Sequence, residues 1–193
     1  MSISQTISSW KQKSEVDYFS LFVPLWLAFD AWCKDKYGLS DQRRCLEALK
    51  NDEINNKTYH KMKSLLNGND SMSITFKSHL NQLEEALKSN PIYYEEAGNV
   101  RSTTTTLSFK NALTDRSVKK YENLFRTSGQ HNKIEIVPGL YVTDEIQKIY
   151  KGYIEILYQV RCYLFHGNLK PDKENERIIK NLYLTLKDLL NEI

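Results

Sequence analysis

The strongest constraint on the fold is an amphipathic stretch in the C-terminal third of the chain. Between residues 143 and 165, apolar side chains recur every three or four positions, as on one stripe of an α-helix. The stripe consists of Ile146, Ile149, Tyr150, Tyr153, Leu157, Val160 and Leu164. We expect Thr143 to cap this helix and Gly167 to end it. A helix of this length must bury its stripe against other elements, which predicts a bundle core.

A second buried helix is expected near the N-terminus. The run from Tyr18 to Cys33 is the most apolar of the chain, and Ser14 is the expected cap of a helix that reaches about Tyr37. Pro24 should kink this helix or mark a short first piece. Further helices are expected over 41–50, 55–66, 74–88 with Ser73 as the cap, 109–125, and from Pro171 onward. Because the two most apolar helices need the most cover, we expect them to form the centre of the bundle.

Little of the chain favours β-structure. Only 7 Gly and 4 Pro occur in 193 residues, which leaves few tight turns. Residues 133–137 alternate and indicate one small strand paired across Pro138-Gly139, and 89–107 reads as a polar loop. The prediction is an all-α bundle of about five to seven helices with a long central loop, forming a single domain over residues 1–193.

Composition narrows the environment and the chemistry. The net charge of +3 permits an anionic partner without requiring one. Three cysteines without a Cys-x-x-Cys spacing argue against a disulfide framework and against a thiolate zinc site. We see no signal peptide, and the apolar N-terminal run is too short to span a bilayer, so we expect a cytoplasmic protein without a membrane partner. We expect no metal and no cofactor, because phosphate-loop, dinucleotide and zinc motifs are missing from the sequence.

Arg161 interrupts the apolar stripe of the C-terminal helix. No carboxylate lies three or four positions away, so its guanidinium needs a partner from another element or an anion, unless it extends into water. His166 follows at the helix end, about 140° around the axis. An imidazole can move a 2′-OH proton, and a guanidinium can hold a phosphate as charge builds on it. The pair is therefore a minimal set for cutting RNA, with a purely structural helix-end histidine as the alternative.

Two other features bear on this pair. Asp30 lies on an apolar face of the first helix, and our hypothesis is that it holds Arg161 or orients His166; the alternative is that it faces a polar loop. Arg126 and His131 repeat the same Arg-x4-His spacing within a polar, glycine-containing segment. We interpret this second copy as chance, or at most as a loop that touches phosphate.

Two segments carry a resemblance to a known family. Residues 160–170, Val-Arg-Cys-Tyr-Leu-Phe-His-Gly-Asn-Leu-Lys, resemble the Arg-x4-6-His signature of the HEPN superfamily. Residues 22–32, Phe-Val-Pro-Leu-Trp-Leu-Ala-Phe-Asp-Ala-Trp, are similar to the first-helix pattern of the same group. The middle of the chain, residues 38–138, fits no subfamily.

The resemblance implies a helical bundle that forms a homodimer and places two Arg/His pairs at one cleft. Many members are metal-independent endoribonucleases that act as toxins of toxin–antitoxin modules or as antiviral defence effectors. RNA would be the substrate, and an antitoxin or another regulatory protein is a possible partner. An inactive module that binds RNA or nucleotide is the alternative, because Cys162 stands where the family often has Asn or Asp.

The resemblance also assigns roles to residues. Arg161 would bind the phosphate, His166 would be the acid and base, and Gly167 would let the chain turn beside the scissile phosphate. The supporting residues would be Asp30, Gly167, Asn168 and Lys170. Independently, a basic stretch that includes Lys119, Lys120 and Arg126 is a weak candidate for tracking an RNA backbone, although such runs are usually solvated faces.

Overall fold

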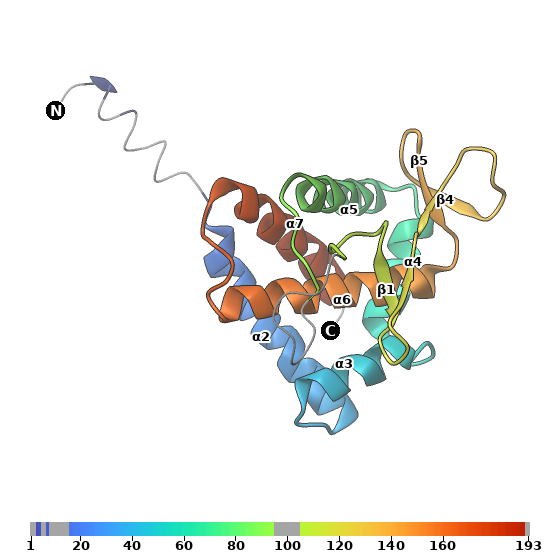
Figure 1. Ribbon diagram of the computed structural model, residues 1–193, viewed down its shortest axis with the longest axis horizontal. Helices are drawn as coiled ribbons and strands as arrows, with labels where there is room; N and C mark the ends of the chain where they lie inside the picture. Colours follow the sequence, from blue (N-terminus) through green and yellow to red (C-terminus); the bar gives the residue numbers. More distant parts are fainter. Residues whose placement is uncertain (1–2, 5–6, 8–15, 95–104, 192–193) are drawn as a thin grey trace.

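The computed structural model describes residues 3–4, 7, 16–94 and 105–191. In these ranges the chain is mostly helical, with two small antiparallel sheets between α5 and α6 (Figure 1). The helices are α2 (Tyr18–Tyr37), α3 (Gln42–Asn51), α4 (Lys57–Asn67), α5 (Ser71–Ser89), α6 (Ile146–Phe165) and α7 (Lys173–Leu190). The strands are β1 (Ala112–Asp115), β2 (Lys120–Glu122), β3 (Phe125–Arg126), β4 (Lys133–Val137) and β5 (Leu140–Thr143). The helical majority confirms the prediction, but a purely α-helical fold is wrong.

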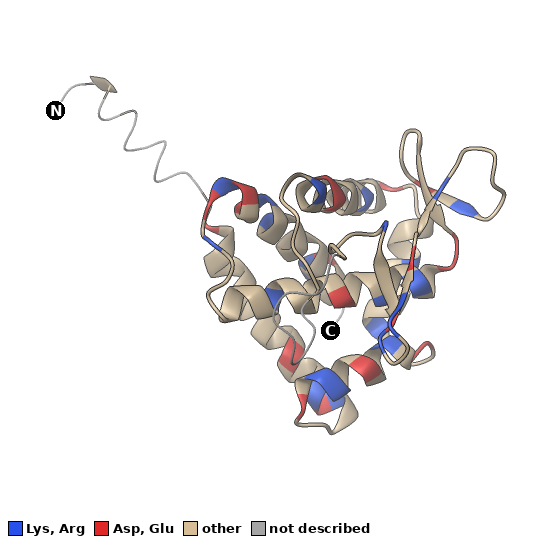
Figure 2. Ribbon diagram, in the orientation of Figure 1, with Lys and Arg blue, Asp and Glu red and all other residues tan. Residues whose placement is uncertain are grey.

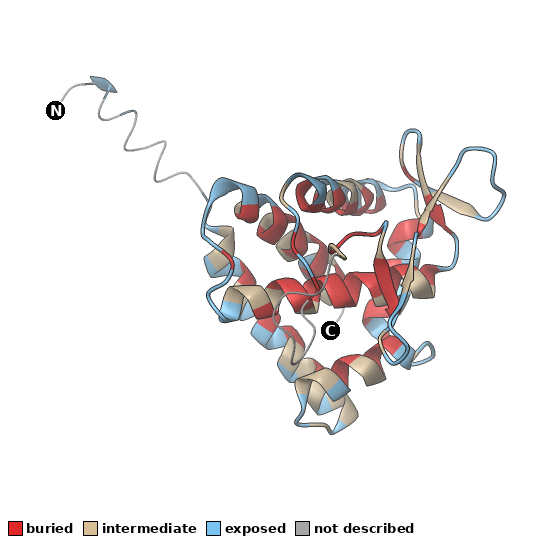
Figure 3. Cartoon of the chain, viewed as in Figure 1, coloured by how far each residue is buried: buried red, intermediate tan, exposed pale blue. Residues whose placement is uncertain are grey.

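Helix α6 forms the centre of the molecule. It crosses the middle of Figure 1, and Figure 3 shows that most of its length is buried. Its neighbours are α3 and α4 on one side and β1 on another, and every residue from 152 to 157 is buried. Helix α7 also buries one stripe, at Ile178, Leu182, Leu186 and Leu189. The burial of α6 therefore matches the 3.6-residue pattern that predicted this helix, and α7 buries residues with the same period.

Helix α2 differs from its prediction. Its cap is Asp17, whose carboxylate accepts hydrogen bonds from the backbone of Phe19 and Ser20, while Ser14 lies outside the described residues. Pro24 lies inside one uninterrupted helix, on an exposed side where the missing N–H is tolerated. The helix packs on α7 and α3 and lies at the edge of the bundle, not at its centre. Nowhere in the described ranges does a helix have the length and apolarity needed to cross a membrane.

Other helix boundaries also differ from the prediction. Asp70, not Ser73, caps α5, and Ser73 lies in the first turn, where its hydroxyl donates to Asp70 at 2.8 Å. The start of α5 is therefore set by a carboxylate that accepts backbone N–H groups. Thr143 ends β5 instead of capping α6, which begins at Ile146 after Glu145 and has no side-chain cap.

The predicted helix over 109–125 is wrong. This segment forms the β1–β2 hairpin and the start of β3. Asp115 accepts from the backbone N–H of Ser117 at 2.9 Å, and Lys119 adopts a left-handed φ of 51°, so the chain reverses where a helix would continue. The predicted strand over 133–137 is confirmed as β4, paired with β5 across Gly139, whose φ is 83°.

Candidate functional site

The C-terminal end of α6 has the predicted geometry. The helix stops at Phe165, His166 occupies the C-cap, and Gly167 takes a left-handed φ of 72°. The backbone N–H of Asn168 then donates to the carbonyl of Tyr163 at 2.8 Å, which closes the last turn. The side chain of His166 is exposed and makes no hydrogen bond within the described part of the chain. Its ring is thus open to solvent and to a ligand.

Arg161 is half-buried between aromatic rings. The centre of its guanidinium lies 4.4 Å from the ring centroid of Phe165 and 5.8 Å from that of Trp26 on α2. Its only hydrogen-bonding neighbour among the described residues is the sulfur of Cys162, at 3.9 Å, and its buried Nε has no acceptor. Aromatic faces stabilise a cation without neutralising it. The guanidinium therefore keeps its charge and several N–H donors for an anion.

Trp26 adds a second unsatisfied donor to this contact. Its side chain is fully buried, and its indole Nε1 has no hydrogen-bond acceptor in the described structure. A buried N–H without an acceptor costs about 1–3 kcal/mol. Two such donors on contacting side chains therefore lower the stability of the fold at this contact.

Asp30 does not hold Arg161 or His166, so that hypothesis is wrong. Its carboxylate pairs with Lys34 at 2.7 Å and accepts from the Gln42 amide at 2.8 Å. The reason is local, because Lys34 lies one helical turn away on the same helix. The hydrogen bond to Asp30 raises the pKa of Lys34, and the nearby charge of Arg161 opposes this shift. Asp30 therefore neutralises a different cation next to the site.

Asn168 and Lys170 line an open cleft beside the end of α6. The cleft measures about 450 Å³ and lies between residues 90–93, Tyr163 and the connection to α7. Both polar and apolar groups line it. The supporting residues after Gly167 are thus close to a hollow, whereas Arg161 is not among its walls.

The second Arg-x4-His copy has a different environment. Arg126 donates from its Nη1 to the carbonyls of Asn123 and Phe125, both at 2.9 Å. His131 lies exposed on the connection between β3 and β4. Arg126 and His131 line one open hollow of about 550 Å³. Nη1 of Arg126 is held by two backbone carbonyls, which fixes this guanidinium to its own loop, unlike that of Arg161. The pair is therefore a natural control for the first copy.

The other weak RNA candidates lie on the β1–β2 hairpin. Lys119 sits in its turn, and Lys120 pairs with Glu122 across a short contact. Neither of them contacts Arg161 or His166 through any interaction recorded for the described residues. The structure therefore does not bring these lysines together with the Arg/His pair.

Sequence analysis missed a buried charge on α6. Glu155 is 0% exposed, and its carboxylate pairs with Arg43 and Lys50 of α3, with Arg116 of the hairpin at 3.6 Å. Burial raises the pKa of Glu155, but the hydrogen bonds from Arg43 and the charge of Lys50 outweigh it and leave the pKa lowered. The sequence signal for Glu155 is the same as for Arg161: each is a charged residue inside an otherwise apolar helix.

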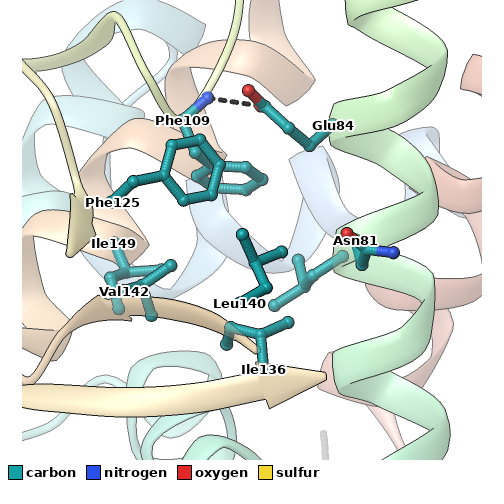
Figure 4. A pocket seen from close by; sticks show the side chains of 9 residues that line it. Asn81, Glu84, Phe109, Phe125, Ile136, Leu140, Val142 and Ile149 are labelled. Atoms are coloured by element: carbon teal, nitrogen blue, oxygen red, sulfur yellow. Dashed lines mark hydrogen bonds between the residues drawn. The ribbon is translucent and has the colours of Figure 1, made fainter. Parts of the chain in front are cut away.

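An apolar pocket between α5 and the three-stranded sheet is a packing feature. Figure 4 shows Phe109, Phe125 and Ile136 around it, with the carboxylate of Glu84 accepting from the backbone N–H of Phe109 at 2.7 Å. Its free space, about 20 Å³, is close to that of a single water molecule. It is too small for a substrate.

Comparison with known proteins adds no assignment, since neither a family model nor a curated protein nor a solved structure matches this chain.

Proposed function

We propose that the chain is a HEPN-like endoribonuclease that uses Arg161 and His166 to cut RNA without a metal ion. The observation that supports this most is the guanidinium of Arg161, half-buried against Trp26 and Phe165 with no carboxylate partner in the described structure. A structural arginine at this depth would be paired. A cation kept open five residues before an exposed histidine, at the end of the same helix, suits a phosphodiester.

In the proposed reaction, a ring nitrogen of His166 takes the proton of the 2′-OH. The 2′-oxygen then bonds to phosphorus while the bond from phosphorus to the 5′-oxygen breaks, and the leaving oxygen acquires a proton. Arg161 stabilises the negative charge that accumulates on the phosphoryl oxygens. The products are a cyclic 2′,3′-phosphate and a 5′-OH end. We propose that the enzyme acts as a toxin of a toxin–antitoxin module or as an antiviral effector, and that a protein partner restrains its activity.

We further propose that the active form is a homodimer that pairs the outer faces of α2. Leu27 is 52% exposed, and Leu21, Pro24, Ala28 and Ala31 are exposed along the same helix. The buried face of α2 supplies Trp26, which contacts Arg161. A second copy on the outer face would therefore pack against the same helix that contacts Arg161 through Trp26, and Phe165, which lies over Arg161, is also exposed.

A fluorogenic RNA assay in the presence of EDTA tests the reaction. His166→Ala should abolish cleavage, while His131→Ala, the histidine of the second copy, should cleave like wild type. The 5′ fragment should carry a cyclic 2′,3′-phosphate by mass spectrometry. Equal activity in wild type and His166→Ala would reject the proposal. RNA binding without cleavage in the wild type would favour the inactive binding module, which the unoriented ring of His166 and the apolar Cys162 also allow.

A further inference from the structure

A second group of cations surrounds Glu155 of α6. Three positive side chains, Arg43, Lys50 and Arg116, face two carboxylates, Glu47 and Glu155. Lys50 and Glu155 are fully buried, so they are fixed parts of the fold. The group therefore has an excess of positive charge, and that excess must lie on its more exposed members.

Arg116 has donors to spare. Arg116 is 33% exposed, and its Nη1 lies 3.6 Å from Glu155, too far for a hydrogen bond. Within the described ranges its guanidinium forms no other ion pair. Arg43, in contrast, donates through both Nη atoms to Glu155 and Glu47, and its remaining Nε is buried, so Arg43 adds charge to the group without an accessible donor. Figure 2 shows Lys and Arg residues of α3 beside the end of the β1–β2 hairpin, which carries Arg116.

Tyr158 connects this group to Arg161. The guanidinium of Arg43 lies over the Tyr158 ring, 4.9 Å from its centroid. Arg161 follows Tyr158 by three residues, so the two side chains are neighbours on the surface of α6. From Glu155 to Arg161 the helix rises about 9 Å. Along α6, Glu155 with its cations from α3 and the hairpin is thus followed by Tyr158 and Arg161.

We propose that Arg116, supported by the positive charge of Arg43, forms a second phosphate-binding site for single-stranded RNA beside α6. The inference rests on the proposed function, because it gives the RNA strand that reaches Arg161 a second contact. The partly exposed ring of Tyr158, which Arg43 contacts, is a surface on which a base can stack. Arg116 is the adjustable member, since it touches Glu155 only through a long ion pair.

The test uses a fluorescent single-stranded RNA in which every 2′-OH is methylated, so that it binds but cannot be cut by 2′-OH attack. Anisotropy titrations over a range of salt concentrations compare wild type, Arg116→Gln and Arg44→Gln. Arg44 is exposed on α3 beside Arg43, so its replacement removes the same charge outside the group. Arg116→Gln should weaken binding several-fold and make the slope of log K against log salt shallower by about 0.7, the value for one phosphate on a single strand.

Arg44→Gln should leave the affinity and the slope unchanged. An unchanged slope in Arg116→Gln, or an equal change in both variants, would overturn the second phosphate site. The urea unfolding midpoints of Arg116→Gln and wild type should coincide, as expected for a partly exposed ion pair. The two proposals fail separately. Cleavage of RNA by His166→Ala would reject the nuclease while the binding result stands. If His166→Ala loses cleavage but Arg116→Gln leaves the salt slope unchanged, only the second phosphate site is rejected.

Discussion

At the scale of single residues, Arg161 is placed for binding at the expense of stability. Its cation–π contacts contribute about 0.5–1 kcal/mol each at most, while its buried Nε costs about 1–3 kcal/mol for want of an acceptor. A side chain whose contacts stabilise the fold by less than its burial costs is typical of functional sites. The same side chain would be easy to replace if folding alone mattered.

Arg161→Met should therefore fold at least as well as wild type. We expect its free energy of unfolding to be at most about 1 kcal/mol below that of wild type, or to exceed it. Met occupies the space of the Arg161 side chain and removes the unsatisfied N–H. Urea denaturation measures this. A loss of 3 kcal/mol or more would mean that the guanidinium has a buried counter-charge, which contradicts the open cation on which the proposed function depends.

Glu155 should behave in the opposite way. Glu155→Gln leaves the buried Lys50 and its neighbour Arg43 without their counter-charge and should cost about 3 kcal/mol at pH 7. Because the folded pKa of Glu155 is lowered, its contribution is present above the ordinary carboxyl pKa of 4.5 and is lost as the pH falls through the folded value. Unfolding measured from pH 7 to pH 2 should thus be less pH-dependent in the variant.

Glu47→Gln is the control for this comparison. Glu47 pairs with the same two cations but is 39% exposed, so its replacement should cost under about 1 kcal/mol. Similar losses in both variants would show that Glu155 has no special role in holding α3 against α6.

At the scale of elements, periodicity predicted the long helices and the strand β4, but not the β1–β2 hairpin. The stripes of α6 and α7 are long, and their burial follows from the sequence. The hairpin after residue 109 was missed because Leu113, Tyr121 and Leu124 fit a helical spacing as well as a strand, and the turn at Asp115 and Lys119 depends on local hydrogen bonds. In the candidate site, the open cation was predictable, whereas the partner of Asp30 was not, because several polar groups compete for one carboxylate.

The position of the β1–β2 hairpin depends on the close contact between β1 and α6. A Cβ added to Gly152 would lie 2.8 Å from the Cβ of Ala112 in β1. Gly152→Ala should gain about 1 kcal/mol of helix propensity but lose more through overpacking, for a net loss of about 1–2 kcal/mol. Chemical denaturation of Gly152→Ala, Ala112→Gly and the double variant should give a favourable coupling of at least about 0.5 kcal/mol. A more stable Gly152→Ala would show that the contact relaxes freely.

At the scale of the whole molecule, α6 organises both the core and the proposed site. Its buried side anchors α3, α4 and β1, while its C-terminal half presents Tyr158, Arg161 and His166 toward solvent or toward neighbouring rings. Helix α2 contributes Trp26 to this end and leaves its opposite face apolar and exposed. The chain therefore combines a guanidinium that has no carboxylate partner among the described residues with an exposed apolar face on α2.

The proposed homodimer makes a prediction about mass. Sedimentation equilibrium should show dimers in wild type and monomers in Leu27→Glu, because a carboxylate in the centre of the paired α2 faces would be buried without a partner. Ile74→Glu is the control, since Ile74 is 59% exposed on α5 and should leave the mass unchanged. RNA cleavage should fall with dissociation in Leu27→Glu and recover at high protein concentration. A fully active monomer would show that one subunit is sufficient, and a Leu27→Glu dimer would place the interface on another face.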